Sequence, residues 1–91
     1  MEKIYILYVG ADNKTKLLYT DFQLAIVSQY FESYTYIECN GVWKGSSEYC
    51  LRIEIATDDR AKLYSLVGDL KARMEQTSIL VVEINSDINF V

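Results

Sequence analysis

Two runs of alternating side chains on either side of a short glycine-containing tip constrain the fold of this chain more than any other feature. Residues 34–43 and 48–56 each alternate with period two, and the tip between them reads Lys44-Gly45-Ser46-Ser47. Alternation with period two is typical of a β-strand, and a tip this short joins antiparallel neighbours. The stretch therefore predicts a β-hairpin.

A strand and a helix are predicted ahead of this hairpin. Residues 3–9 are β-branched or aromatic on both alternating sets, which predicts a strand in the middle of a sheet. Residues 20–23 have the form T-x-x-Q, which predicts a helix N-terminus with a capping box. Apolar residues at helical spacing continue to Ser33, so we expect the helix to reach that residue.

A second helix and a last strand are predicted after the hairpin. Thr57-Asp58-Asp59 supplies an N-terminal cap, and an apolar stripe follows at helical spacing, made of Leu63, Val67, Leu70 and Met74. Residues 79–84 read as a strand in which Glu83 stands among apolar neighbours. We expect Glu83 either to point outward at a sheet edge or to be a buried carboxylate with its own cation.

The predicted order is βαββαβ, which favours a ferredoxin-like α+β fold: a four-stranded antiparallel sheet with two helices on one face. The chain has 91 residues, contains no proline and shows no linker, so we expect a single domain over residues 1–91. An irregular α+β domain is the alternative.

The burial pattern of the hairpin allows a choice between two registers. A two-residue turn would set Cys39 opposite Cys50 and mix polar with apolar residues on both faces of the sheet. A three-residue loop sets Ile37 opposite Ile53 and keeps one face apolar, so we choose it. This register predicts that Cys39 and Cys50 leave opposite faces, which excludes a disulfide or a shared metal site unless a bulge at Asn40-Gly41 shifts the pairing.

The chosen register also predicts which residues form an exposed surface. If helices cover the Ile37–Ile53 face, a mixture of aromatic and charged side chains remains open, and its members are Tyr34, Tyr36, Glu38, Cys50, Arg52 and Glu54. Such a mixture is typical of an interface, so we predict that the protein self-associates through it. An ordinary solvated face is the alternative.

The hairpin tip is the second candidate site. Trp43, Lys44 and Gly45 are candidate ligand-binding residues, because a large aromatic beside a turn can be offered to a partner, and a lysine with turn amides can hold a small anion. The alternatives are a tip that serves only as a turn and a Trp43 ring that folds over the edge of the core.

Several classes of function are excluded by what the sequence lacks. It has no histidine, so Ser–His and Cys–His nucleophile arrangements are absent, and Lys44-Gly45-Ser46-Ser47 lacks the upstream glycine order and the following helix of a phosphate-binding loop. We therefore expect no enzyme activity, no catalytic residue, no metal and no cofactor, and the remaining alternative is an enzyme that works through carboxylates and tyrosines. The nine Lys and Arg residues are scattered within a net charge of −4, which argues against nucleic acid binding.

The expected location is the cytoplasm. No apolar run reaches the length of about 18 residues that a membrane span needs, so we expect no membrane partner. The two cysteines do not form a secreted disulfide framework, which fits a reducing compartment.

The pattern Trp43-Lys44-Gly45-x-x-Glu48, followed by a strand, a capped helix and an apolar strand, resembles the divalent-cation tolerance proteins and the wider PII-like group over roughly residues 34–84. That resemblance implies a small ferredoxin-like domain that forms trimers with ligands in clefts between subunits. The chain departs from the group because residues 74–78 hold no His-Pro-Tyr-like segment and the hairpin is shorter than a PII nucleotide-binding loop. From this resemblance we therefore expect a trimer for this chain, but we do not expect metal or ATP binding.

The function predicted from these observations is that of a non-enzymatic binding protein. It would self-associate through the open sheet face and use the hairpin tip for a small anionic ligand or a protein partner. The alternative is a small accessory inhibitor of the phage or mobile-element type that docks on a larger protein or on a nucleic-acid enzyme.

Overall fold

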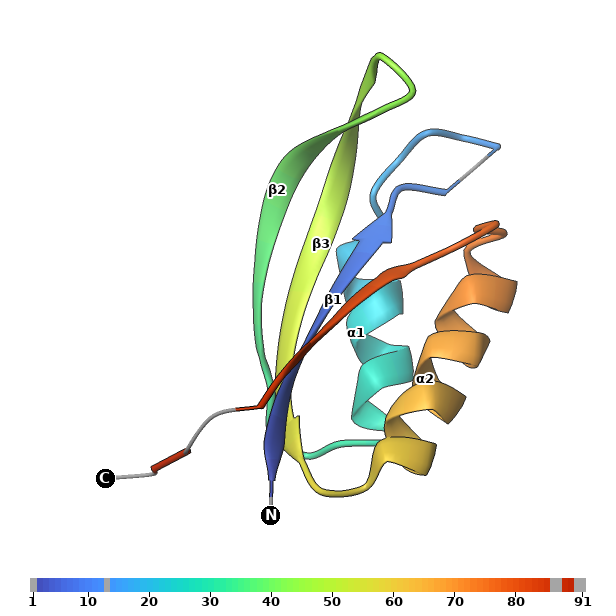
Figure 1. The fold of residues 1–91 in the computed structure, drawn as a ribbon. Helices are drawn as coiled ribbons and strands as arrows, with labels where there is room; N and C mark the ends of the chain where they lie inside the picture. Colours follow the sequence, from blue (N-terminus) through green and yellow to red (C-terminus); the bar gives the residue numbers. More distant parts are fainter. Residues whose placement is uncertain (1, 13, 86–87, 90–91) are drawn as a thin grey trace.

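The computed structural model describes residues 2–12, 14–85 and 88–89, and its elements follow the predicted order. They are β1 (Lys3–Gly10), α1 (Thr20–Ser28), β2 (Thr35–Trp43), β3 (Ser46–Thr57), α2 (Arg60–Arg73) and β4 (Leu80–Ile84). The strands form one antiparallel sheet in the order β2-β3-β1-β4. Figure 1 shows α1 and α2 packed on one face of this sheet. The ferredoxin-like α+β fold is thus confirmed.

The core lies between the two helices and the central strands. β1 pairs with β3 on one side and β4 on the other, which confirms its predicted central position. Its odd-numbered side chains face the helices together with their partners on β3, and these are Tyr5, Leu7, Val9, Leu51, Ile53 and Ile55, all buried. No helix of the described residues covers the opposite face of the sheet, and we call it the open face.

The first helix differs from its prediction at both ends. It begins at Thr20, but no capping box forms: the Thr20 hydroxyl donates instead to Glu38 Oε1 at 2.6 Å, and the Gln23 amide is buried without a hydrogen-bond partner. The helix ends at Ser28 rather than Ser33, because the backbone N–H groups of Gln29 and Tyr30 bond three residues back and turn the chain.

The second helix matches its prediction more closely. Asp59 is the N-cap, and its Oδ1 accepts a hydrogen bond from the backbone N–H of Lys62 at 3.0 Å. Leu63, Leu70 and Met74 of the apolar stripe are buried in the core. Among the residues that the structure describes, no helix is long and apolar enough to cross a membrane.

The predicted register of the hairpin is wrong by one residue. Lys44 and Gly45 form a two-residue turn, so Cys39 pairs with Cys50 and Ile37 pairs with Arg52. The burial argument failed because β2 is an edge strand that the helices do not cover, and most of its side chains on both faces are exposed. A strand with two exposed faces does not specify its own register, so the turn decides it.

This register corrects the predicted open face. Arg52 and Glu54 do project from it, but Tyr36 and Glu38 lie on the helix side, because they pair with the buried Ile53 and Leu51. Tyr34 precedes β2 and shares a hydrogen bond with Ser28 Oγ of α1 at 2.7 Å. In their place the open face carries mostly apolar side chains, namely Ile4, Ile6, Tyr8, Ile37, Leu80, Val82 and Ile84.

The exclusion of a disulfide is also wrong. Cys39 and Cys50 are direct cross-strand partners with their Cα atoms 5.1 Å apart, and the structure joins them by a disulfide. Partners in an antiparallel pair point to the same face, so the two sulfur atoms meet on the open side of the hairpin.

Glu83 in the edge strand β4 is a partly buried carboxylate with cations of its own. Its Oε1 accepts hydrogen bonds from Lys3 Nζ at 3.1 Å and from the Tyr5 hydroxyl at 3.2 Å, and Arg60 Nε lies 3.6 Å from its Oε2. The hydrogen bond and charge of Lys3 hold the pKa of Glu83 below its usual range, against the opposing effect of burial. The two hydrogen bonds connect β1 to β4, and the ion pair with Arg60 connects the start of α2 to the same carboxylate.

This cluster predicts a pH-dependent loss of stability. A carboxyl whose pKa is lowered by folding stabilises the protein above its unfolded pKa, about 4.3, and that contribution disappears as the pH falls through the lower folded value. We expect Glu83→Gln to lower the melting temperature at pH 7, and we expect its difference from the wild type to become smaller as the pH falls below about 4.3. The exposed Glu32→Gln variant should match the wild type across this pH range. Equal differences between Glu83→Gln and the wild type at pH 7 and pH 3 would contradict this account.

Candidate functional site: a groove beside the hairpin arm

The hairpin continues past the end of β1 and forms a projecting arm. The last residue pair between β1 and β3 is Gly10 with Cys50, whereas β2 and β3 stay paired as far as Trp43 and Ser46. We call residues 40–49 the hairpin arm, and Figure 1 shows it extending beyond the rest of the sheet. Lys44 and Gly45 can form its tight turn because both adopt positive φ, +49° and +80°.

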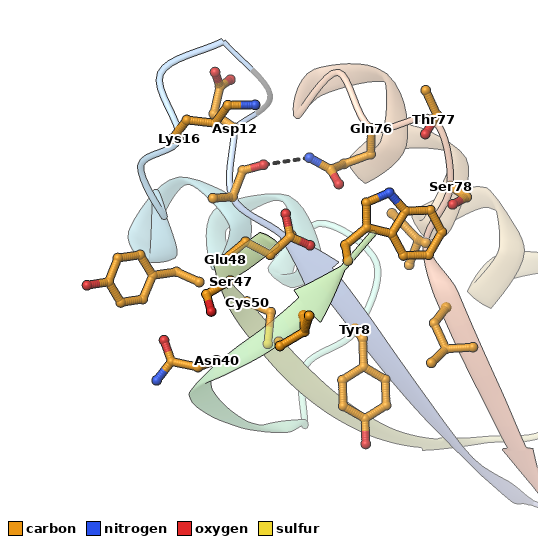
Figure 2. Close-up of a pocket in the computed structure, with 18 residues that line it drawn as sticks. Tyr8, Asp12, Lys16, Asn40, Ser47, Glu48, Cys50, Gln76, Thr77 and Ser78 are labelled. Atoms are coloured by element: carbon orange, nitrogen blue, oxygen red, sulfur yellow. Dashed lines mark hydrogen bonds between the residues drawn. The ribbon is translucent and has the colours of Figure 1, made fainter. Parts of the chain in front are cut away.

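A groove of about 1020 Å³ lies between the hairpin arm and two segments that are distant in sequence. The arm forms one wall, the loop after β1 forms the end, and residues 76–80 form the other wall. Its lining includes three aromatic residues (Tyr8, Trp43 and Tyr49), two carboxylates (Asp12 and Glu48), and the polar side chains of Asn40, Ser47, Gln76, Thr77 and Ser78. Figure 2 shows labelled side chains around this hollow.

The polar floor of the groove depends on the absence of a side chain at Gly10. A Cβ there would lie 2.9 Å from Gln76 Oε1 and 3.4 Å from Glu48 Oε1, so both side chains occupy the space beside Gly10 at the end of β1. The other end of the Gln76 amide donates to the Ala11 carbonyl oxygen at 2.6 Å, which is the dashed line in Figure 2. The amide thereby fixes the segment after α2 against the end of β1.

Asp12 is held as an ionised carboxylate at the loop end of the groove. Its Oδ1 accepts hydrogen bonds from the backbone N–H groups of Thr15 and Lys14, each at 2.9 Å. These bonds, with that of Thr15 acting most strongly, lower the pKa of Asp12. The lining also includes one cation, Lys16, so its charged side chains are two carboxylates, Asp12 and Glu48, and one ammonium. This balance leaves one net negative charge beside flat aromatic surfaces, which suits a cationic ligand better than an anionic one.

Only one of the three predicted ligand-binding residues lines the groove. Trp43 does so with 57% of its surface exposed, while Lys44 and Gly45 form the turn outside it. Lys44 Nζ lies 5.9 Å from the centre of the Trp43 ring, the geometry of a cation–π contact rather than of an anion site facing the groove. A ligand role for Lys44 and Gly45 stays a prediction.

The remaining groove residues were missed by the sequence analysis. Glu48 was visible within the Trp-Lys-Gly-x-x-Glu pattern, which is the signal that could have identified it. Asp12 and Gln76 gave no such signal, because they come from segments that only the folded chain brings to Gly10. Among the described residues there is no group of three or more acidic or cysteine side chains placed to hold a metal ion.

Comparison with known proteins gives matches in structure but not in sequence. Neither a protein-family model nor a curated protein matches the chain. A DUF3240 family protein from Shewanella baltica OS155 is similar with a TM-score of 0.66 and 14% identity, covering 99% of this chain and 94% of that one. The periplasmic divalent cation tolerance protein CutA from Archaeoglobus fulgidus has a TM-score of 0.62 and 12% identity, with 99% and 88% covered.

A phage SAM lyase in its apo state is similar over almost the whole length of both chains. Its TM-score is 0.61 and its identity is 16%, covering 97% of this chain and 92% of the lyase. The chain has the fold of these proteins. The resemblance to the divalent-cation tolerance proteins is thus confirmed at the level of the fold, and identities this low carry no further conclusion.

The Gly10–Gln76 contact makes a testable prediction about the groove floor. Gly10→Ala should displace the Gln76 amide and break its hydrogen bond, which lowers the unfolding free energy by about 1 kcal/mol relative to the gain that a glycine-to-alanine change gives elsewhere. Gln76→Ala should cost a similar amount. The double variant should lose less than the sum, because both changes remove the same contact. Urea unfolding measures all three.

Gly68→Ala is the matched control for this series. Gly68 lies within α2 with no atom within 4 Å of an added Cβ, so alanine there should stabilise the protein by about 0.5–1 kcal/mol. Fully additive losses at Gly10 and Gln76 would show that the two residues do not share one contact.

Proposed function

We propose that this protein binds a small cationic ligand with a flat ring, of the S-adenosylmethionine class, in the groove beside the hairpin arm. The observation that carries the proposal is the pairing of carboxylates with aromatic surfaces in one hollow: Asp12 and Glu48 with Tyr8, Trp43 and Tyr49. S-adenosylmethionine joins a positively charged sulfonium to an adenine ring. Support also comes from the similar fold of a protein described as a phage SAM lyase.

The groove offers a distinct contact for each part of such a ligand. The exposed Trp43 ring provides a stacking surface for adenine, an interaction worth about 1–3 kcal/mol per base. The Glu48 carboxylate above Gly10 and the ionised Asp12 attract the sulfonium and ammonium charges. This ligand replaces the small anion expected from the tip residues.

We also propose that the protein acts as a homo-oligomer, with the trimer favoured. The support is the open face, where Ile37 is 61% and Leu80 is 62% exposed beside Val82 and a central Arg52–Glu54 ion pair of 2.8 Å. Ile37 lies on one edge strand of the sheet and Leu80 and Val82 lie on the other. Exposed apolar side chains at both edges of one sheet face are consistent with an interaction surface. Tyr8, Leu80 and Cys50 belong both to the open face and to the groove, so a second copy docked there would border the ligand.

Cleavage of the bound sulfonium compound is a second candidate function. It is favoured by the carboxylate of Glu48 in the groove and by the similarity to a protein named as a lyase for this compound. The absence of histidine does not argue against this reaction. In an elimination, the Glu48 carboxylate would take a proton from the carbon next to the carbon–sulfur bond, and the electrons of that C–H bond would form a carbon–carbon double bond. The carbon–sulfur bond breaks at the same time, both of its electrons pass to sulfur, and a neutral thioether leaves without being protonated. The non-enzymatic binding protein remains our first proposal.

Isothermal titration calorimetry with S-adenosylmethionine tests the binding proposal. We expect saturable binding, and we expect Trp43→Ala and Glu48→Gln each to weaken it about tenfold, which corresponds to 1.4 kcal/mol. Phe22→Ala and Glu32→Gln are the matched controls, since both residues are exposed and lie outside the groove lining. Mass spectrometry of the same mixtures separates binding from cleavage by detecting a thioether product. Absence of binding, or equal affinity in all variants, would reject the groove as the site.

Native mass spectrometry tests the oligomer. We expect assemblies larger than the 10.5 kDa chain, and we expect Ile37→Glu to dissociate them by placing a charge on the open face. Tyr64→Glu, an exposed aromatic position on α2, is the control and should leave the assembly intact. A wild-type protein that stays at 10.5 kDa at every concentration would reject self-association and favour the accessory inhibitor.

A further inference from the structure

The cysteine pair lies where the hairpin arm leaves the sheet. Cys50 is the last β3 residue that still pairs with β1, through Gly10, and Cys39 is its partner on β2. The next backbone contact along these strands is a hydrogen bond from the Ala11 N–H to the Tyr49 carbonyl oxygen, 3.1 Å long. The disulfide therefore closes the base of the arm, across a sequence separation of 11 residues.

Beyond that base the two strands of the hairpin arm are held by their backbone pairing and by the turn, and their side chains are not packed into the core. Residues 42–49 are all exposed, including Val42 at 72% and Tyr49 at 60%. A two-stranded hairpin without a packed face is at best marginally stable in water. A cross-link at its base removes much of the conformational freedom that the arm would otherwise have, because it closes the loop that the arm forms.

We propose that Cys39 and Cys50 form a reversible dithiol–disulfide site that orders the hairpin arm and, through it, the groove. In the disulfide form the arm is clamped and holds Trp43 and Glu48 along the groove. In the dithiol form the two strands separate more easily and one wall of the groove is lost. The effect on ligand affinity rests on the proposed function, while the effect on the arm does not.

The chemistry requires only a small disulfide such as oxidised glutathione. Cys39 is half-buried and Cys50 is buried, so Cys39 is the thiol that meets the small disulfide first. Its thiolate attacks one sulfur of glutathione disulfide and releases one glutathione thiol, and the Cys50 thiolate then displaces the second. The protein loses two protons and two electrons, and glutathione disulfide gains both to become two thiols. In the reducing cytoplasm that the sequence predicts, the dithiol is the resting form, and oxidation clamps the arm.

The redox state of Cys39 and Cys50 can be followed through the mobility of the hairpin arm. Trp43 is the single tryptophan of the chain and lies on the hairpin arm, so its fluorescence anisotropy reports the mobility of the arm without any ligand. Amide hydrogen exchange of residues 40–49 gives the same information by an independent route. The amides of β1 and α2 serve as an internal control for the rest of the fold.

The experiment compares wild-type protein in glutathione mixtures of increasing oxidised fraction with the Cys39→Ala/Cys50→Ala double variant in the same mixtures. We expect the wild type to lose two hydrogens by mass on oxidation, Trp43 anisotropy to rise and arm amides to exchange about tenfold more slowly. We expect S-adenosylmethionine to bind the oxidised form about tenfold more tightly, since the arm is then ordered in advance. The double variant should resemble the reduced wild type in every mixture, and because the reduced wild type needs no substitution, misfolding of the variant would not affect the test.

The possible failures are distinguishable. If reduction leaves Trp43 anisotropy and arm exchange unchanged, or if native protein never exchanges with glutathione, the reversible clamp is overturned. If oxidised and reduced forms bind S-adenosylmethionine equally, control of the groove is overturned and the proposed function stands. If neither form binds it while the arm still responds to oxidation, the clamp stands and the proposed function fails.

Discussion

The two-residue turn at Lys44 and Gly45 is the constraint on which the rest of the candidate site depends. Positive φ at both residues gives a turn whose twist matches that of the flanking strands, and it fixes the pairing of every residue along β2 and β3. Lys44 adopts a positive φ, a backbone conformation that residues other than glycine rarely adopt. That turn places Cys39 opposite Cys50, sends Tyr36 to the helix side and leaves Ile37 on the open face.

The fold could be predicted from the sequence but the candidate site could not, and the hairpin shows the reason. Element order, the central position of β1 and the Asp59 cap follow from local patterns that survive in the folded chain. The register of β2 did not follow, because a burial pattern informs only where a strand has one covered face. β2 has none, so mixed polar and apolar neighbours such as Ile37 beside Arg52 cost little there. The capping box at Thr20 failed for a related reason: its hydroxyl found a tertiary partner in Glu38.

The groove illustrates a different limit of sequence reasoning. Trp43 and Glu48 could be named from one short stretch, but their partners come from the loop after β1 and the segment after α2. What joins the three segments is Gly10, where the missing side chain leaves room for Gln76 and Glu48. Proteins with this fold at 12–16% identity share the backbone arrangement, so the chemistry of the site has to be argued from these residues themselves.

The register of the hairpin is the central claim, and nuclear Overhauser effects between the strands test it most directly. The structure predicts cross-strand contacts between the backbone protons of Ile37 and Arg52 and between those of Cys39 and Cys50. A set of cross-strand contacts centred on the pairs Ile37–Ile53 and Cys39–Leu51, in place of these two pairs, would contradict it. In that case the open face, the cysteine clamp and the arrangement of the groove would all have to be abandoned.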